Sequence, residues 1–304
     1  MSCTHKQSAM PEPKTARGRR IVKGREPQLV EDAKRTLLVR GPRASALGKT
    51  LLSELGCVLA PLADKLGKDN EQLMPFENRQ SIEGLCRLND TPLFLLSSKT
   101  KKRPHGITFG RCFDFQVLDM AEFAVEESSF KAMKEVQKIV ERTTAVTSGS
   151  KPLLLFNGEE FDHDPDFSAF KNLMIDMFRG QVVERLNLNG IERAIVFTSK
   201  EKTIFFRHYA IALTRNQAGS PTVALEEIGP RFDMKFSRRF SADDKFRATA
   251  MKQPSQLRIK HRKNVEKGMV GQVLGRVHME KQNLDEMALR RIKKRKVTAS
   301  KQLE

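Results

Sequence analysis

The sequence has few cysteines, and none of them form a pair with the short spacing of a metal site. Four cysteines occur among 304 residues, at Cys3, Cys57, Cys86 and Cys112. Disulfide frameworks are typical of short secreted chains that are rich in cysteine, and structural zinc sites use closely spaced pairs such as C-x-x-C. We therefore expect free thiols in the core, with no disulfide, no metal site and no cofactor held by sulfur.

Long apolar runs are also missing. No stretch approaches the ~20 apolar residues that a membrane-spanning helix requires. The polar N-terminus, which contains proline, has no apolar core of a secretory signal. These absences predict an intracellular protein without a membrane partner.

Aromatic residues suited to stacking on nucleic-acid bases are scarce. The chain has no tryptophan and one tyrosine, although it has 19 phenylalanines. Proteins that read single-stranded bases commonly stack them on aromatic side chains. If this chain binds nucleic acid, shape and charge should therefore dominate its recognition.

Positive charge is abundant and is concentrated at the two ends of the chain. The formal net charge is +18. Residues 231–304 hold 21 Lys and Arg against 8 Asp and Glu, residues 1–40 hold 10 against 4, and residues 41–230 hold 24 against 25. Basic ends favour a polyanionic partner, with nucleic acid first and an anionic membrane surface next. The alternative is that the basic ends only increase solubility.

Hydrophobic patterns predict an α/β body whose pattern is repeated. Apolar runs indicate strands, and apolar residues at helical spacing indicate helices, one of them capped by Ser45. The first half is predicted to contain a strand at 36–41, a helix at 45–59, a short helix at 81–88, a strand at 92–98 and further strands within 107–120. The second half is predicted to contain a strand at 151–158, a helix at 167–178 and strands at 195–199, 203–213 and 223–236. The repetition favours two related α/β halves, although two generic α/β units would give a similar pattern.

The predicted organisation has three parts. Residues 1–27 are polar and basic and are expected to form a disordered arm. Residues 28–236 form the α/β body, with halves at about 34–128 and 150–236 and a linking helix near 130–140. Residues 237–304 form a basic tail, expected to be largely extended or disordered, in which 284–296 can fold as a helix when it meets RNA or protein.

Some segments resemble catalytic motifs without completing them. The stretch RASALGKT ends like a phosphate-binding loop, but Arg43 stands where the leading glycine is required. A degenerate P-loop NTPase is therefore an alternative function. The acidic residues at 159–166 could hold a hard cation, but their spacing does not fit an EF-hand, and a solvated helix entrance is favoured. No recognisable serine or cysteine nucleophile context stands beside His105, His208, His261 or His278.

The stretch VALEEIGPRFDMKFSRRF, at 223–240, changes abruptly from acidic to basic. Gly229 and Pro230 predict a bend or bulge with a structural role, because glycine allows unusual backbone angles and proline lacks an N–H. After the bend, Phe232, Met234 and Phe236 alternate with polar residues as in a strand with one buried face. We interpret this strand as the end of the body, which directs the basic tail. A simple turn between two core strands is the alternative.

Clustered cations are the candidate RNA-binding residues. Phosphate contacts from such residues give affinity without reading base identity. Solvated charge runs or a nuclear-import signal would look similar. The candidates are Lys99, Lys101, Lys102, Arg103, Arg111, Arg231, Lys235, Arg238, Arg239, Arg258, Lys260, Arg262, Lys263, Arg290, Arg291, Lys293, Lys294, Arg295 and Lys296.

Several long segments resemble the Brix-domain family. They are KKRPHGITFGRCFDFQVLDM, KPLLLFNGEEFD, LMIDMFRG, LEEIGPRFDMKF and GRVHMEKQNLDEM, and they occur in the family's order. The resemblance implies two similar α/β halves, akin to the anticodon-binding domains of some aminoacyl-tRNA synthetases. His105 and Gly106 depart from the polar residues that relatives often carry, so the shape of the preceding basic loop is left open.

The same resemblance implies a function. It implies a non-enzymatic protein of the nucleus and nucleolus, without a cofactor, that binds 5S rRNA and large-subunit precursor rRNA. Its implied protein partners are the regulator of ribosome synthesis and the ribosomal proteins of the 5S ribonucleoprotein, which it helps to recruit to the precursor. A basic chromatin protein that binds DNA is a second alternative, because charge alone does not distinguish RNA from DNA.

Overall fold

The computed structural model describes residues 15–25, 29–139, 146–183, 185–187, 190–215, 221–254, 256–257, 262–268 and 271–279. The chain divides into two compact units, at 1–254 and 255–304. None of the helices among the described residues is long and apolar enough to cross a membrane.

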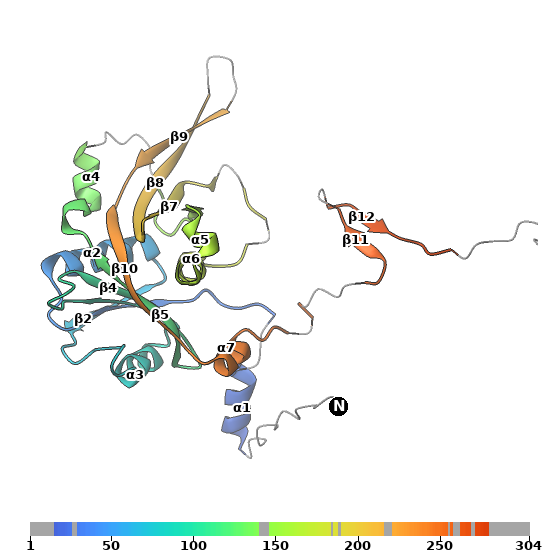
Figure 1. Cartoon of the computed structure of the whole chain (residues 1–304), viewed down its shortest axis with the longest axis horizontal. Helices are drawn as coiled ribbons and strands as arrows, with labels where there is room; N and C mark the ends of the chain where they lie inside the picture. Colours follow the sequence, from blue (N-terminus) through green and yellow to red (C-terminus); the bar gives the residue numbers. More distant parts are fainter. Residues whose placement is uncertain are drawn as a thin grey trace, which may run out of the picture. The chain divides into compact units, whose positions relative to one another are not determined.

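A single ten-stranded sheet forms the centre of the first unit (Figure 1). Its order is β2-β1-β3-β4-β5-β10-β8-β7-β6, and β9 pairs with β8. The strands are β1 (Thr36–Arg40), β2 (Ala63–Asp69), β3 (Leu93–Ser98), β4 (Gly106–Phe113), β5 (Gln116–Val125), β6 (Leu153–Asn157), β7 (Arg193–Lys200), β8 (Thr203–Arg215), β9 (Pro221–Glu227) and β10 (Phe232–Ser241).

The sheet consists of two related halves joined edge to edge. In the first half β1 is parallel to β3, which continues into antiparallel β4 and β5. In the second half β6 is parallel to β7, which continues into antiparallel β8 and β10. The halves meet where β5 pairs antiparallel with β10. The predicted α/β fold of two similar halves is confirmed.

Helices cover the two faces of the sheet unequally. The helices are α1 (Ala16–Arg25), α2 (Ala46–Leu59), α3 (Gln80–Asn89), α4 (Met133–Ile139), α5 (Glu160–His163), α6 (Pro165–Phe178) and α7 (Asp244–Ala250), with a 3-10 helix at Glu127–Ser129. Helices α2, from the first half, and α6, from the second, pack into one core with strands of both halves. Helix α3 covers the other face, over the first half only.

Aromatic packing joins the two halves through α6. Phe170 of α6 lies edge-on to Phe109 of β4 and Phe123 of β5, with ring centroids 6.0 and 4.9 Å apart. The same ring contacts Phe197 of β7 at 5.8 Å. Burying a phenylalanine stabilises a fold by about 1.5–3 kcal/mol. Because the Phe170 side chain contacts strands of both halves, the halves should unfold together.

The second half is less complete than the first. Among the described residues, nothing in the second half corresponds to β2 at the sheet edge or to α3 over the second face. Leu153 and Leu155 of edge strand β6 face away from α6, and because no helix covers them there among the described residues, they are 41% and 42% exposed. This half therefore carries an open strand edge beside an apolar surface.

The structure differs from the sequence prediction at several elements. Helix α1 lies within the arm predicted to be disordered. Strand β2, of sequence ADKLGKD, was not predicted because an edge strand needs few apolar residues. Strand β10 continues beyond Phe236 to Ser241, and α7 follows, with Phe246 packed on Phe113 at 5.7 Å. In the second unit, β11 (Val265–Lys267) and β12 (Val273–Gly275) form a hairpin where an extended tail was expected.

Candidate nucleic-acid interface

The segment Lys99–Arg103, here called the basic loop, connects β3 to β4. Its backbone is closed by two hydrogen bonds between Thr100 and Arg103, and the Lys99 N–H donates to the Pro42 carbonyl at 3.1 Å. Lys99, Lys101 and Lys102 are exposed. Within the described part of the chain, none of these three lysines forms an ion pair, so their charges face solvent.

His105 fixes the end of the basic loop. Its Nδ1 lies 2.9 Å from Ser45 Oγ, and its Nε2 lies 3.3 Å from Glu127 Oε2. Ser45 Oγ also accepts the Gly48 N–H at 3.1 Å and so caps α2, as predicted. The histidine therefore ties the loop to the start of α2, which settles the loop shape that the sequence left open.

A buried carboxylate holds two of the candidate arginines together. Glu122 of β5 has a side chain that is only 3% exposed. It forms ion pairs with Arg103 Nε, at 3.2 Å, and with Arg238 Nε. Arg103 also donates to Ser237 Oγ at 2.9 Å. The basic loop is thereby attached to β10 across β4 and β5.

Aromatic rings support the β10 side of this cluster. The Arg238 guanidinium lies 4.0 Å from the centre of the Phe76 ring, and Arg79 lies 4.2 Å from that of Phe240. A guanidinium over an aromatic face gains about 0.5–2 kcal/mol, depending on exposure. The Arg238 side chain remains 44% exposed and, with Lys99, lines a cavity of about 110 Å³.

Lys235 lies near the basic loop on the same sheet. Its Cα partner on β5 is Ala124, which pairs on its other side with Gly106, the first residue of β4. Lys235 is exposed. Lys235 and the basic loop therefore lie at the same end of three adjacent strands, where one extended polyanion can reach both.

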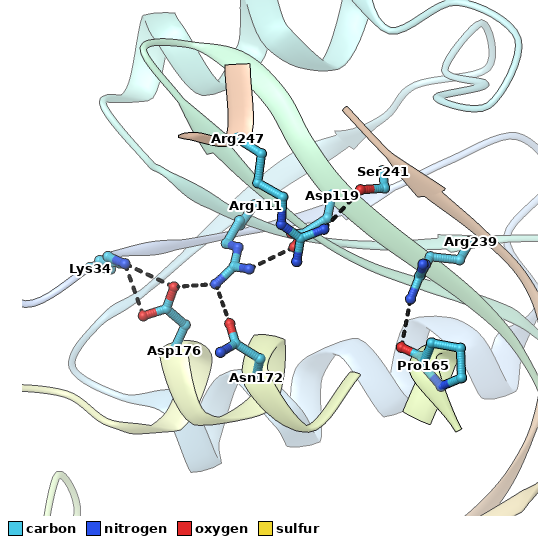
Figure 2. Close-up of polar contacts among 9 residues, drawn as sticks. All are labelled: Lys34, Arg111, Asp119, Pro165, Asn172, Asp176, Arg239, Ser241 and Arg247. Carbon is cyan, nitrogen blue, oxygen red and sulfur yellow. Dashed lines mark hydrogen bonds and ion pairs between the residues drawn. The ribbon is translucent and has the colours of Figure 1, made fainter. Parts of the chain in front are cut away.

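Arg111 is held inside an ion-pair network on the opposite face (Figure 2). Its guanidinium lies 2.6 Å from Asp119 and 2.8 Å from Asp176 and donates to Asn172 at 2.9 Å. Lys34 Nζ also lies 2.8 Å from Asp176. Burial alone would lower the pKa of Arg111, but the two carboxylates together raise it. The network joins β4 and β5 to α6, and two carboxylates already offset the charge of Arg111.

Two further candidates also form intramolecular ion pairs. Arg239 donates to the Pro165 carbonyl at 2.7 Å, at the start of α6 (Figure 2). It also lies 3.2 Å from Asp166. Arg231 lies 3.6 Å from Glu227. These arginines stabilise the fold locally, and their contact with RNA stays a prediction.

Gly229 and Pro230 form the break between β9 and β10. Gly229 has φ of +73°, and a Cβ built there would lie 3.0 Å from Val136 Cγ2. Its carbonyl accepts a hydrogen bond from the His208 ring at 2.6 Å. Glycine is required here because the backbone angle is left-handed and α4 lies against it. The predicted bend is present, and a separate register shift follows between Phe236 and Arg238.

The tail candidates are only partly described. Arg262 and Lys263 are exposed, next to the β11–β12 hairpin. The remaining candidates and the predicted helix at 284–296 lie outside the described residues: Arg258, Lys260, Arg290, Arg291, Lys293, Lys294, Arg295 and Lys296.

The phosphate-loop lookalike has a structural explanation. Gly48 is inside α2, where a Cβ would lie 2.1 Å from Ser97 Oγ. Lys49 lies 2.6 Å from Asp69, and Thr50 donates to the Ala46 carbonyl. The lysine and threonine of this segment are thus engaged by the fold.

The acidic residues at 159–166 and the cysteines have structural positions in the fold. Asp164 accepts the Asp166 N–H and caps α6, as a helix entrance should. Across the described ranges, no group of three or more acidic, His or Cys side chains could hold a metal ion. Cys86 and Cys112 are buried, whereas Cys57 is exposed, contrary to expectation, because it lies on the solvent side of α2.

Glu122 and Asp119 are the site residues that sequence reasoning missed. Both lie in β5, within the otherwise apolar segment QVLDMAEFAV, and both are buried. A buried acid requires a basic partner. That signal was available in the sequence, but the identity of the partners depends on strand pairing.

Known proteins are similar in sequence to this chain over most of its length. The family model described as Brix domain matches residues 41–238. The chain is 35% identical over 264 residues to the mouse Ribosome production factor 2 homolog, covering 87% of this chain and 84% of the relative. It is 31% identical over 292 residues to the Ribosome biogenesis protein RPF2 of Saccharomyces cerevisiae, covering 92% and 83%.

A solved structure gives a weaker likeness. The probable ribosomal biogenesis protein from Aeropyrum pernix is 11% identical, with a TM-score of 0.40, and the match covers 66% of this chain and 96% of that chain. The family assignment therefore depends on the domain match and the relatives above 30% identity. The chain belongs to the Brix-domain family.

Proposed function

We propose that this chain is a non-enzymatic ribosome assembly factor that binds ribosomal RNA and a protein partner. The names of its relatives, ribosome production factor and ribosome biogenesis protein, support a role in ribosome biogenesis. In the finer proposal the chain brings the 5S ribonucleoprotein to the large-subunit precursor and supports maturation of its rRNA. Its place of action is then the nucleolus.

The observation that carries RNA binding is the basic loop on its rigid support. Its exposed lysines have no described carboxylate partner, while Arg103 and Arg238 are fixed by buried Glu122. Cations held in position lose less conformational freedom on binding than cations on a free tail. The loop and Lys235 provide phosphate contacts in the first unit, the tail candidates at 258–263 and 290–296 provide others, and Arg111, Arg231 and Arg239 support the fold.

Protein binding is supported by the incomplete second half. Edge strand β6 is unpaired on one side within the described sheet, and two of its own residues, Leu153 and Leu155, are exposed. An exposed strand edge can accept a further strand from a partner. We propose that the regulator of ribosome synthesis docks here and that the ribosomal proteins of the 5S ribonucleoprotein join the resulting complex.

The test of RNA binding compares two double variants. Lys101→Ala/Lys102→Ala removes two loop charges, and Lys245→Ala/Lys252→Ala removes two exposed charges at and after α7, by the opposite end of β4. Each phosphate contact contributes about 0.7 to 0.9 to the slope of log K against log salt. The loop variant should therefore lose about 1.4–1.8 from this slope and about 15- to 30-fold in affinity for 5S rRNA near 0.15 M salt.

The control variant should keep both the slope and the affinity. A loop variant with an unchanged slope would remove the basic loop from the RNA site. Competition with duplex DNA of equal length at the same salt separates this function from that of a chromatin protein. Equal affinity for DNA would favour the chromatin alternative.

A further inference from the structure

A cavity of about 350 Å³ lies between the C-terminal ends of α2 and α6. Leu62, which lines the cavity, accepts a hydrogen bond from the N–H of Thr36, the first residue of β1. The cavity therefore lies at the start of the parallel strands, whereas the basic loop follows the end of β3. Ligand sites in proteins are commonly about 300–1,000 Å³. The cavity walls are mostly apolar and include Val58, Leu59, Pro61, Leu62, Met177 and Phe178.

Three cationic side chains line the same cavity, at Lys151, Arg179 and Arg193. Arg193 is only 5% exposed, and it donates to the Ser150 and Val58 carbonyls at 2.6 and 3.1 Å. Lys151 donates to the Gln181 carbonyl at 2.7 Å. In the part of the chain that the structure describes, none of these cations forms an ion pair with a carboxylate.

Helix ends offset only part of this charge. The C-termini of α2 and α6 both border the cavity, and each carries about half a negative charge. Two such ends amount to about one negative charge, against three cationic side chains. Burial lowers the pKa of Arg193 and the neighbouring Glu192 partly opposes this, so Glu192 offsets a further part of the charge and a net positive charge remains along the cavity.

Two features of the cavity favour a polar ligand. The Ser150 hydroxyl is buried and has no hydrogen-bond partner. Burial, and then the neighbouring Arg179, lower the pKa of Lys151, because both make the charged lysine less stable than it is in water. A bound anion would satisfy the hydroxyl and relieve the repulsion between the two cations.

We propose that this cavity binds a carboxylate that stands beside a large apolar side chain on a partner protein chain. The cations and the Ser150 hydroxyl receive the carboxylate, and the walls formed by α2 and α6 receive the apolar group. A phosphate backbone fits less well, because the apolar walls would stay unfilled around it. The inference is independent of the proposed RNA binding, which uses the other end of the sheet.

The test uses the full chain and three soluble probes. N-acetyl-leucyl-leucine carries a carboxylate beside an isobutyl group, N-acetyl-leucyl-leucinamide is its neutral counterpart, and a uridine trinucleotide represents RNA. Binding is followed by ligand-detected NMR at millimolar probe concentrations. The variant Lys151→Gln/Arg179→Gln removes the two cations that do not bridge to α2, and Lys245→Gln/Lys252→Gln is the matched control.

The proposal expects the acid to bind at least tenfold more tightly than the amide, because charge-assisted hydrogen bonds are lost with the carboxylate. The cavity variant should lose this preference while its melting temperature stays near that of the control. Equal binding of acid and amide, no binding of the acid, or a tighter trinucleotide that the cavity variant weakens would each overturn the proposal.

Discussion

Glu122→Gln tests whether a buried carboxylate holds the basic loop to β10. The glutamine keeps the size of the side chain and removes the charge that pairs Arg103 and Arg238. Breaking a fully buried ion pair costs about 3–5 kcal/mol. Here the two arginine side chains are 20% and 44% exposed, so water can solvate them after the change. We therefore expect a smaller loss, of about 1.5–3 kcal/mol in the free energy of unfolding.

Urea denaturation followed by circular dichroism measures this loss. A loss of about 2 kcal/mol corresponds to a melting temperature lower by about 4–8 °C. Glu71→Gln is the control, because Glu71 is exposed, and it should change stability by less than about 0.5 kcal/mol. If Glu122→Gln were as stable as Glu71→Gln, the account of the loop's support would be refuted.

Other predictions concern the network, the bend and the phosphate-loop lookalike. Burial alone would raise the pKa of Asp176, but Lys34 and Arg111 lower it below its ordinary value of 3.8. The ionised Asp176 therefore stabilises the folded state above pH 3.8, and this stabilisation is lost as the pH falls through the pKa of the folded state. Asp176→Asn should therefore be less stable than wild type in urea at pH 7, with the difference in stability shrinking as the pH falls below 3.8, and a constant difference would contradict this. Gly229→Ala should lower the free energy of unfolding by about 1–3 kcal/mol, because the φ of Gly229 is positive. The control Gly84→Ala, in α3 with open space around it, should be neutral or stabilising. Equal effects of the two variants in thermal melts would refute the requirement for glycine at 229. Magnesium and ATP should leave the melting temperature unchanged. A nucleotide site filled at a hundred times its dissociation constant would raise the free energy of unfolding by about 2.7 kcal/mol, and a rise in melting temperature would therefore favour the NTPase alternative.

Local signals in the sequence were enough to predict most of the fold. The spacing of Leu51, Leu52 and Leu55 predicted α2, and the run at 92–98 predicted β3, because both elements bury continuous apolar surface. Strand β2 was missed because its polar sequence is held by pairing with β1, which lies far away along the chain. The aromatic Phe246 could have indicated α7, but its partner Phe113 is distant in sequence.

The candidate site was predictable only as a set of cations. Lys101 and Lys235 are exposed as expected, but Arg111 is paired with Asp176, which lies 65 residues away on α6. A cation in a sequence is free or paired according to tertiary neighbours that composition does not specify. For the same reason Glu122 could be recognised as a buried acid, while its two arginine partners could not be identified.

RNA crosslinking mapped to individual residues, on large-subunit precursor particles that contain this chain, tests the central claim most directly. The account predicts crosslinks within the basic loop, at Lys99, Lys101 and Lys102, and at Lys235 on β10. A particle in which the chain crosslinks to RNA only through other surfaces, with the basic loop unmodified, would contradict it.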